Sequence, residues 1–359
     1  MMCARIGMVS GRGLSGVFSK KFSSPVVTFA ISTLLIANTI NVGADLSGMA
    51  DAAEMLTHVS SHIWVIFFAV GISFATVRLR YYQIANTLKW LALVLFAYVA
   101  TALIIHPDWH RAVRDTFIPS IPKDKGAWET VVAILGTTIS PYLFFWQSTQ
   151  EVEEEKAAGR NTIAKRRGAT DVEIRTRRFD ITVGSFFSQI VMYFIILATA
   201  VTLHDHGYMN IETSKDAAMA LRPLAGELAA TLYTVGIVGV GLLAIPTLTG
   251  SAAYAFAEAF GWKQGLDKRL QQARSFYLMI LMSTIAAVAI DFLDISPVKA
   301  LYWSAVINGV LAPFLLIGII IVASDGKLMN NQPSMMLAKA VVGLTTVLMF
   351  IAAAAMFLV

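Results

Sequence analysis

Cysteine and charge are both scarce in this chain. Cys3 is the single cysteine among 359 residues, so one chain can form neither an intramolecular disulfide nor a metal cage of several thiolates. Only 14% of the residues are charged, against about 25% in an ordinary soluble domain. This composition argues against a water-soluble protein and excludes an intrinsically disordered one.

Apolar residues are abundant instead, at 57% of the chain, and the mean hydropathy is +0.66. Many apolar runs exceed the roughly 18 residues needed to cross the hydrocarbon of a bilayer. The sequence therefore predicts an all-α polytopic membrane protein, with a single transmembrane domain over residues 1–359 and the lipid bilayer as its partner. The nine predicted spans cover residues 25–56, 60–77, 87–105, 128–150, 181–203, 225–257, 274–293, 298–322 and 334–358.

Lysine and arginine are distributed unevenly between the connections. Alternate connections hold 20 and 7 of them, and the positive-inside rule assigns the richer set to the cytoplasm. The N-terminus is then cytoplasmic, as expected for an integral protein of the cell inner (plasma) membrane. Because the basic residues are spread over several loops, the net charge of +5 gives no reason to expect a nucleic-acid partner.

Two hydrophilic segments are assigned to the cytoplasmic side. Residues 1–24 precede a long apolar run, and we interpret them as a cytoplasmic segment rather than as a signal peptide, because the run is too long and lacks a cleavage site. Residues 151–180 are the most charged stretch and are typical of a solvated loop into which a helix continues. Binding of anionic lipid head groups is the alternative for this loop.

The fourth predicted span contains a helix break. Gly136, Thr137 and Thr138 weaken the turn before Pro141, which removes a backbone donor and clashes with the carbonyl four residues back. The carbonyls freed near Gly136 and Thr137 lie at the negative end of a half-helix, where they suit a cation. The alternative is an ordinary proline kink that Thr and Ser hydroxyls repair.

The first predicted span carries polar residues on one helical face. Asn38, Asn41 and Asp45 are spaced at i, i+3 and i+7, so they share one side of a helix near mid-membrane. A carboxylate within a membrane is costly and typically marks a pathway or a site. A polar contact that holds helices together is the alternative.

Enzyme motifs are missing from the sequence. It contains no G-x-S-x-G elbow, no H-E-x-x-H zinc motif and no phosphate-binding glycine loop. The six histidines lie at or beyond the ends of the predicted spans, where they are poor candidates for buried ligands. We therefore expect no enzymatic activity and no resident cofactor, and we favour translocation of a small cation.

The helix break belongs to a longer motif. The run Gly136-Thr-Thr-Ile-Ser-Pro-Tyr-Leu-Phe-Phe-Trp-Gln147, followed by Gln150-Glu-Val-Glu-Glu154, resembles the sixth helix of the NRAMP-like divalent metal transporters. Met2-Cys-Ala-Arg-Ile-Gly-Met-Val-Ser-Gly-Arg12 looks like the cytoplasmic end of that family's second helix. Ala44-Asp45-Leu46 resembles part of its third helix, and Pro313-Phe314 part of its tenth.

This resemblance implies a LeuT-type fold, in which two inverted five-helix repeats surround a site at the bilayer midplane. The nine predicted spans would then be family helices three to eleven. The family's first helix, which supplies half of the metal ligands, and most of the second have no counterpart here. We therefore expect an N-terminal truncation or a misplaced start, and the resemblance implies that residues 1–24 are the cytoplasmic end of a truncated helix.

The resemblance also implies two metal ligands, the Thr137 carbonyl and Ser140, on either side of the break that Pro141 creates. Ser140 occupies the position of the family's metal-binding methionine, and Tyr142 that of the histidine after proline. Sulfur is then absent from the expected pocket. Oxygen ligands favour hard ions such as Mg²⁺ and Mn²⁺, whereas a thioether favours softer metals.

Three further positions would lie along the ion pathway by this resemblance. Asp45 and Asn41 belong to the family's third helix, where Asp45 would shape the electrostatics of the cavity or a proton path. Gln147 replaces a further histidine, and Gly48 stands where many members have an acidic residue. Coupling of transport to protons by the family's usual groups is therefore in doubt.

The sequence as a whole predicts transport of a divalent metal cation by alternating access. The ion would belong to the Mn²⁺/Fe²⁺ class or, because of Ser140, would be Mg²⁺. One alternative is that the chain as given is a truncated remnant or subunit that transports nothing. Another is a LeuT-type transporter of an organic substrate. The oligomeric state is not predicted.

Overall fold

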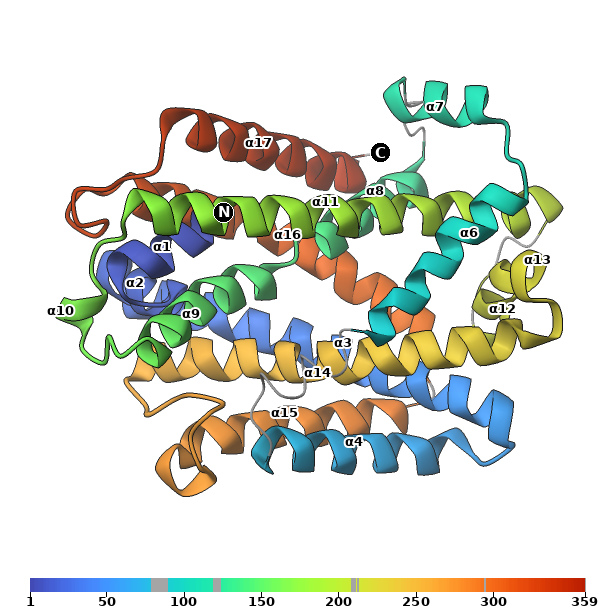
Figure 1. The fold of residues 1–359 in the computed structure, drawn as a ribbon, viewed down its shortest axis with the longest axis horizontal. Coiled ribbons are helices and arrows are strands. Elements are labelled where there is room, and N and C mark those ends of the chain that lie inside the picture. The colour runs from blue at the N-terminus through green and yellow to red at the C-terminus, as the bar shows by residue number, and fades with distance from the viewer. Residues whose placement is uncertain (79–89, 119–123, 208–210, 212, 294, 359) are drawn as a thin grey trace.

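The structure is a computed structural model that describes residues 1–78, 90–118, 124–207, 211, 213–293 and 295–358. Every regular element in these ranges is helical, and none is a strand. The long helices run roughly side by side along the long axis of the molecule (Figure 1). The prediction of an all-α fold is therefore confirmed.

The chain consists of long helices and of short helices that connect some of them. The long helices are α3 (Ser24–Thr57), α4 (Ser61–Arg78), α8 (Lys125–Thr138), α9 (Pro141–Ala157), α11 (Asp171–Thr202), α14 (Ala229–Phe260), α15 (Arg274–Asp291), α16 (Pro297–Ser324) and α17 (Met336–Leu358). The short ones are α1 (Met2–Ser10), α2 (Leu14–Lys21), α6 (Phe96–Ile104), α7 (Trp109–Phe117), α10 (Ile163–Arg166), α12 (Ser214–Ala218) and α13 (Arg222–Ala225).

Eight segments within the described ranges are long and apolar enough to cross a membrane. They match eight of the nine predicted spans, and α8 and α9 together form one of them, Lys125–Ala157. The third predicted span, 87–105, begins outside the described residues and continues as a 3-10 helix and the short α6. Counting the pair Leu93–Ile104 and Trp109–Phe117, bent by 117°, as one span would give nine.

The predicted loop over residues 151–180 is much shorter in the structure. Helix α9 continues to Ala157 and α11 already begins at Asp171. A capping box starts α11, because Glu173 N donates to the Thr170 hydroxyl at 3.2 Å while Thr170 N donates to the Glu173 carboxylate at 2.8 Å. The charges of this stretch therefore lie mostly on the ends of two helices.

The N-terminal residues form two short helices rather than the end of one. Gly11, with a φ of 66°, ends α1 in the left-handed conformation that glycine adopts without strain. The side chains of Ile6, Val9 and Leu14 are fully buried against residues of α9 and α16. Most of residues 1–18 are therefore part of the core of the bundle, whereas residues 19–21 at the end of α2 are exposed.

Helix α3 lies at the centre and packs against α4, α14, α15 and α16. Helices α11 and α17 lie on the outside of the bundle (Figure 1). Their outward side chains are large, apolar and exposed, as a lipid-facing surface requires. These exposed residues include Phe186, Phe187, Ile196, Val341, Leu344, Val347 and Leu348.

We refer to the two ends of the bundle by their charge. The basic end carries the connection 158–170, residues 261–273 and the N-terminal turn at Gly11. The opposite end carries α7, α12 and α13 (Figure 1). Lys21, the last residue of α2, forms an ion pair with Asp325, the residue after α16, at 2.6 Å. This pair joins the ends of the two helices at the basic end.

Candidate functional site

The predicted helix break is present between α8 and α9. Helix α8 ends at Thr138, and α9 begins at Pro141. Ile139 has φ −111° and ψ 54°, and Ser140 is extended with φ −70° and ψ 130°. The extended conformation of Ser140 follows from the proline ring, which disfavours a helical residue before it.

The carbonyls at the break are not bare, because Ser140 folds back onto them. Its hydroxyl lies 2.7 Å from the Gly136 carbonyl oxygen and 2.9 Å from that of Thr137. Ser140 itself is buried, with 5% of its surface exposed. The proline kink repaired by a hydroxyl, which the sequence left open, therefore describes this geometry well. A cation that contacts the Thr137 carbonyl oxygen would therefore also lie close to the Ser140 hydroxyl.

Gly136 sets the approach of α8 to α16. A Cβ atom at this position would lie 1.9 Å from the Ala305 carbonyl oxygen and 2.4 Å from Gly309 N. The reverse contact is equally tight, since a Cβ on Gly309 would lie 2.3 Å from the Val132 carbonyl oxygen. The backbones of the two helices touch here, as is usual for small residues at membrane helix crossings.

A sulfur atom also lies beside the break. The Thr138 hydroxyl donates to Met192 Sδ, on α11, at 3.7 Å. Position 140 lacks a thioether as expected, but the neighbourhood of the break is not free of sulfur. No local pattern predicts this contact, because the charged connection separates α11 from the break along the chain.

Asn38 and Asn41 on α3 hold neighbouring helices. Asn38 is fully buried, and its amide donates at 2.9 Å to both the Leu248 carbonyl and the Ser251 hydroxyl of α14. The Ser304 hydroxyl of α16 donates to Asn41 Oδ1. Both residues make the polar helix contact that the sequence left as an alternative to a site.

Asn41 is nevertheless connected to the break through α16. Its partner Ser304 precedes Ala305, whose carbonyl abuts Gly136. Tyr142, just after Pro141, is half-buried and packs against the core clusters that contain Leu34 and Val42 of α3. The structure thus brings Asn41, Tyr142 and the break into one region.

Asp45 and Gln147 lie differently from the other predicted residues. Asp45 is half-buried and accepts no hydrogen bond from any residue that the structure describes. Gln147 Nε2 donates to Glu151 Oε1 at 2.7 Å, so its amide is directed along α9 toward the basic end and away from the break. The structure does not bring Gln147 together with Ser140.

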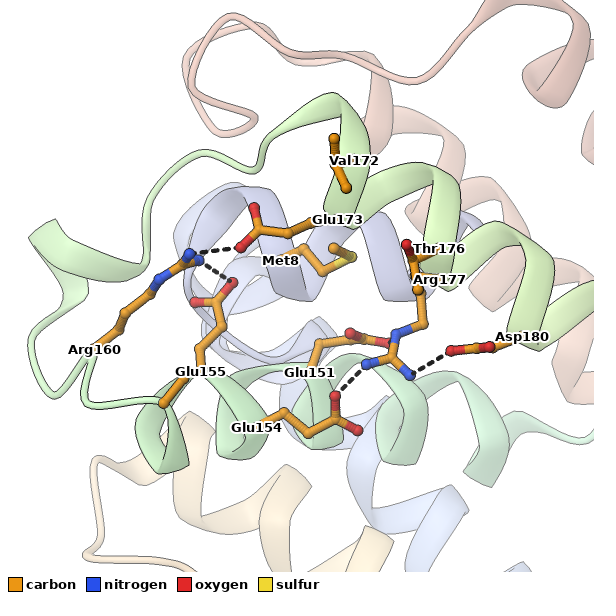
Figure 2. A pocket seen from close by; sticks show the side chains of 11 residues that line it. Met8, Glu151, Glu154, Glu155, Arg160, Val172, Glu173, Thr176, Arg177 and Asp180 are labelled. Carbon is orange, nitrogen blue, oxygen red and sulfur yellow. Dashed lines mark hydrogen bonds and ion pairs between the residues drawn. The ribbon is translucent and has the colours of Figure 1, made fainter.

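A cluster of acidic and basic side chains joins α9 to α11 at the basic end (Figure 2). Arg177 Nε lies 2.9 Å from Glu151 Oε1, and the same guanidinium pairs with Glu154. Arg160 lies 2.5 Å from Glu173 Oε1. These residues line a cavity of about 310 Å³. No local pattern in residues 151–180 predicts this cluster, because their high charge is typical of a solvated loop.

Acidic residues also gather at the opposite end of α3. Asp291 of α15 accepts from the Ser47 hydroxyl at 2.6 Å and lies 2.7 Å from His62 Nδ1. Nowhere in the described ranges do three or more His, Cys, Asp or Glu side chains form a group that could hold a metal ion. A metal at the break would therefore have no such cluster to hold it among the described residues.

Comparison with known proteins places these features in one family. A sequence model of the family described as "Nramp: Natural resistance-associated macrophage protein-like" matches residues 1–359. The chain belongs to this Nramp-like family.

Curated relatives of this Nramp-like chain include divalent metal cation transporters named MntH. The protein from Caldanaerobacter subterraneus subsp. tengcongensis is 25% identical over 334 residues, which are 91% of this chain and 74% of the relative. The protein from Yersinia pestis (strain Pestoides F) is 24% identical over 259 residues, 70% of this chain and 59% of the relative.

Solved structures support the fold of the Nramp-like chain. A mutant of the Eremococcus coleocola manganese transporter superposes with a TM-score of 0.73 at 18% identity, covering 98% of this chain and 75% of that one. The same transporter in complex with an aromatic bis-isothiourea substituted compound gives the same TM-score at 17% identity. The predicted LeuT-type architecture is confirmed by this match.

Proposed function

We propose that this chain forms a transmembrane pathway for divalent metal cations, with the ion passing the break between α8 and α9. Membership of the Nramp-like family and similarity to divalent metal cation transporters named MntH support this proposal. The similar structure is a manganese transporter, which favours Mn²⁺ as the ion class. Mg²⁺ is the other candidate, because the two ligands that we propose at the break, Thr137 and Ser140, offer hard oxygens.

The observation that carries the site is the Ser140 hydroxyl against two carbonyls of α8. A hydroxyl has one proton and two lone pairs, so Ser140 can donate to the Gly136 or Thr137 carbonyl while a lone pair faces a cation. The Thr137 carbonyl has a second lone pair of its own. Ser140 and Thr137 are thus the two proposed ligands, and both offer neutral oxygen atoms.

Neutral oxygens alone bind a divalent ion weakly, so water or further ligands would complete its shell. Asp45 supplies a carboxyl group on α3 to which no described residue donates a hydrogen bond, so a cation in the cavity would stabilise its ionised form. We assign Asp45 an electrostatic role and Asn41 the role of holding α16 beside the break. Tyr142 would line the pathway.

Alternating access requires α8 and α9 to change their relation at the break. Residues Ile139 and Ser140 are the non-helical hinge between them, and hinges of a few residues absorb such changes. The pairing of Arg177 with Glu151 and Glu154 would make α9 and α11 move together at the basic end. The positive-inside rule places that end, and the N-terminus, in the cytoplasm.

Reconstitution of the chain into liposomes that contain a metal-sensitive dye tests the proposal. We expect uptake of Mn²⁺, or of Mg²⁺ measured in parallel, and loss of most uptake in Ser140→Ala and Asp45→Ala. Absence of uptake of either ion by the unmodified chain would contradict the function. Uptake that survives the two substitutions combined would contradict only the site.

The choice of ion has its own test at position 140. Ser140→Met adds a thioether, which favours soft metals, so uptake of Cd²⁺ relative to Mg²⁺ is expected to rise. Ser140→Leu adds similar bulk without sulfur and is the matched control. Equal metal preferences in the two variants would show that the side chain at this position does not touch the ion.

A further inference from the structure

A second cavity, separate from the proposed pathway, opens at the basic end. It has a volume of about 260 Å³ and lies between α2, the end of α9, the connection 158–170 and the segment after α14. A single carboxylate, Glu258, lines it. Five cationic side chains line it, namely Arg12, Lys156, Arg166, Lys263 and Lys268.

Most of this positive charge is not neutralised by the protein. Lys156 pairs with Glu153 at 2.6 Å, but Arg12, Lys263 and Lys268 form no ion pair with the residues that the structure describes. The crowding of charge reaches α2, where repulsion from the Arg12 guanidinium is the main cause that lowers the pKa of Lys20. The cavity is therefore a region of positive potential.

Arg166 is the buried member of the group, with 6% of its surface exposed. Its Nε donates to the Gly11 carbonyl at 3.3 Å and its Nη1 to the Arg160 carbonyl at 2.9 Å. Within the described part of the chain it forms no ion pair, although its charge acts on the Glu155 carboxylate. Glu155 is already paired with Arg160 at 3.8 Å, so an anion in the cavity would supply the buried guanidinium with a counter-ion of its own.

Glu258 can offset only one of the five positive charges that line the cavity, and the hydrogen bonds to its carboxylate come from neutral donors. Its Oε2 accepts from Gly16 N at 3.1 Å, and its Oε1 accepts from the Thr149 hydroxyl and from Gln264 Nε2, both at 3.3 Å. A Cβ on Gly13 would lie 2.0 Å from Oε1, so the carboxylate is packed against the backbone turn. The cations are left to face the open space.

We propose that this cavity binds a phosphate group, carried either by an anionic lipid head group or by a soluble phosphate. An arginine fork matches phosphate geometry, and lysines provide point charges around it. Exposed apolar side chains stand beside the cavity, since Ile163 lines it and Trp262 stacks on Phe260 at 5.6 Å. Basic pockets between helices that border such groups suit lipid head groups. The bound phosphate would bridge α2, α9 and the segment after α14.

Binding to the purified chain in neutral detergent tests the proposal. We expect native mass spectrometry to show retention of dioleoylphosphatidylglycerol, and thermal unfolding to shift upward with it, whereas dioleoylphosphatidylcholine does neither. A separate arm titrates inorganic phosphate against chloride at equal ionic strength. Stabilisation by phosphatidylglycerol alone assigns the site to lipid, and saturable stabilisation by inorganic phosphate assigns it to a soluble anion. If neither phosphatidylglycerol nor inorganic phosphate binds or stabilises the chain, the proposal is overturned.

A pair of matched variants separates the cavity from general surface charge. Lys263→Gln combined with Lys268→Gln removes two exposed cavity lysines and is expected to weaken binding at least about tenfold. Lys165→Gln combined with Arg175→Gln removes the same charge from exposed positions at this end that do not line the cavity. Equal weakening by both pairs would overturn the proposal, because it would show binding to the surface as a whole.

Discussion

At the scale of single residues, Ser140 has two consequences that follow from one hydroxyl. It occupies the position of an expected metal ligand, and it can donate to the Thr137 carbonyl, whose helical donor Pro141 removes, or to the Gly136 carbonyl before it. An unsatisfied carbonyl inside a membrane costs free energy comparable to a lost hydrogen bond. Ser140 therefore stabilises the break whether or not an ion is bound.

This dual role predicts a loss of stability in Ser140→Ala without metal present. Removal of the hydroxyl leaves buried carbonyls at Gly136 and Thr137 unpaired, and we expect the free energy of unfolding to fall by about 1–2 kcal/mol. Thermal unfolding in detergent measures the shift. Thr199→Ala, which removes a hydroxyl bonded to carbonyls of an intact helix turn, is the control and should change little. Equal shifts in Ser140→Ala and Thr199→Ala would mean that the Ser140 hydroxyl does not stabilise the break.

At the scale of helices, the close crossing of α8 and α16 determines where in the bundle the break between α8 and α9 lies. Gly136 and Gly309 face the opposing backbone so closely that no side chain fits between them. Ala305 and Ser304, in the same turn of α16, then reach Gly136 and Asn41. The position of the proposed ion site therefore depends on two glycines that contribute no ligand.

Substitution of Gly136 by Ala should separate these helices. The added methyl group would meet the Ala305 carbonyl at 1.9 Å, and overpacking of this kind costs about 1–3 kcal/mol or more. We expect a lower unfolding temperature and loss of transport. Gly343→Ala in α17 is the control, because nothing lies within 4 Å of its new Cβ, and it should be neutral or stabilising. If Gly136→Ala unfolds like Gly343→Ala, the close crossing is wrong.

The second helix-scale contact is the cluster around Arg177. Glu151 has 2% of its surface exposed, and Arg177 provides its positive partner at 2.9 Å. Arg177→Gln is expected to lower the free energy of unfolding by about 2–3 kcal/mol, since a buried carboxylate loses its counter-ion while the arginine itself is partly exposed.

Two further variants test whether the loss of stability in Arg177→Gln comes from the unpaired Glu151 carboxylate. Glu151→Gln added to Arg177→Gln removes the orphaned charge and should recover part of the stability. Arg175→Gln, at an exposed position two residues away, should lie within about 0.5 kcal/mol of the unmodified chain. Chemical or thermal unfolding in detergent distinguishes the three. No recovery in the double variant would show that the pairing does not matter.

At the scale of the whole molecule, the two ends differ in charge and should face different compartments. The positive-inside rule assigns the basic end to the cytoplasm. The single cysteine makes this testable, because Cys3→Ala gives a background without thiols. In that background, Asp205→Cys at the opposite end should react with a membrane-impermeant maleimide in intact cells, and Asn161→Cys should react only after permeabilisation. Both native residues are exposed. The reverse pattern would invert the proposed orientation.

Much of the architecture follows from local properties of the chain. Apolar length gave eight spans that the structure confirms, and Pro141 with its preceding residues gave the position of the break. The structure differs from the prediction in two segments, residues 151–180 and residues 1–24. The capping box at Thr170 starts α11 inside the stretch that its charge had suggested was a loop. Residues 1–24 fold as two buried helices although their composition resembles a helix end.

The sequence by itself determined the membrane-spanning helices, their alternation of basic connections and the break in α8–α9, because each depends on neighbours along the chain. Only the tertiary structure decided what these features face. Asn41 meets Ser304 across 263 residues, and Arg166 meets the Gly11 carbonyl across 155. Such partners are set by how the helices pack, and helix packing depends on contacts between distant residues that no local pattern encodes.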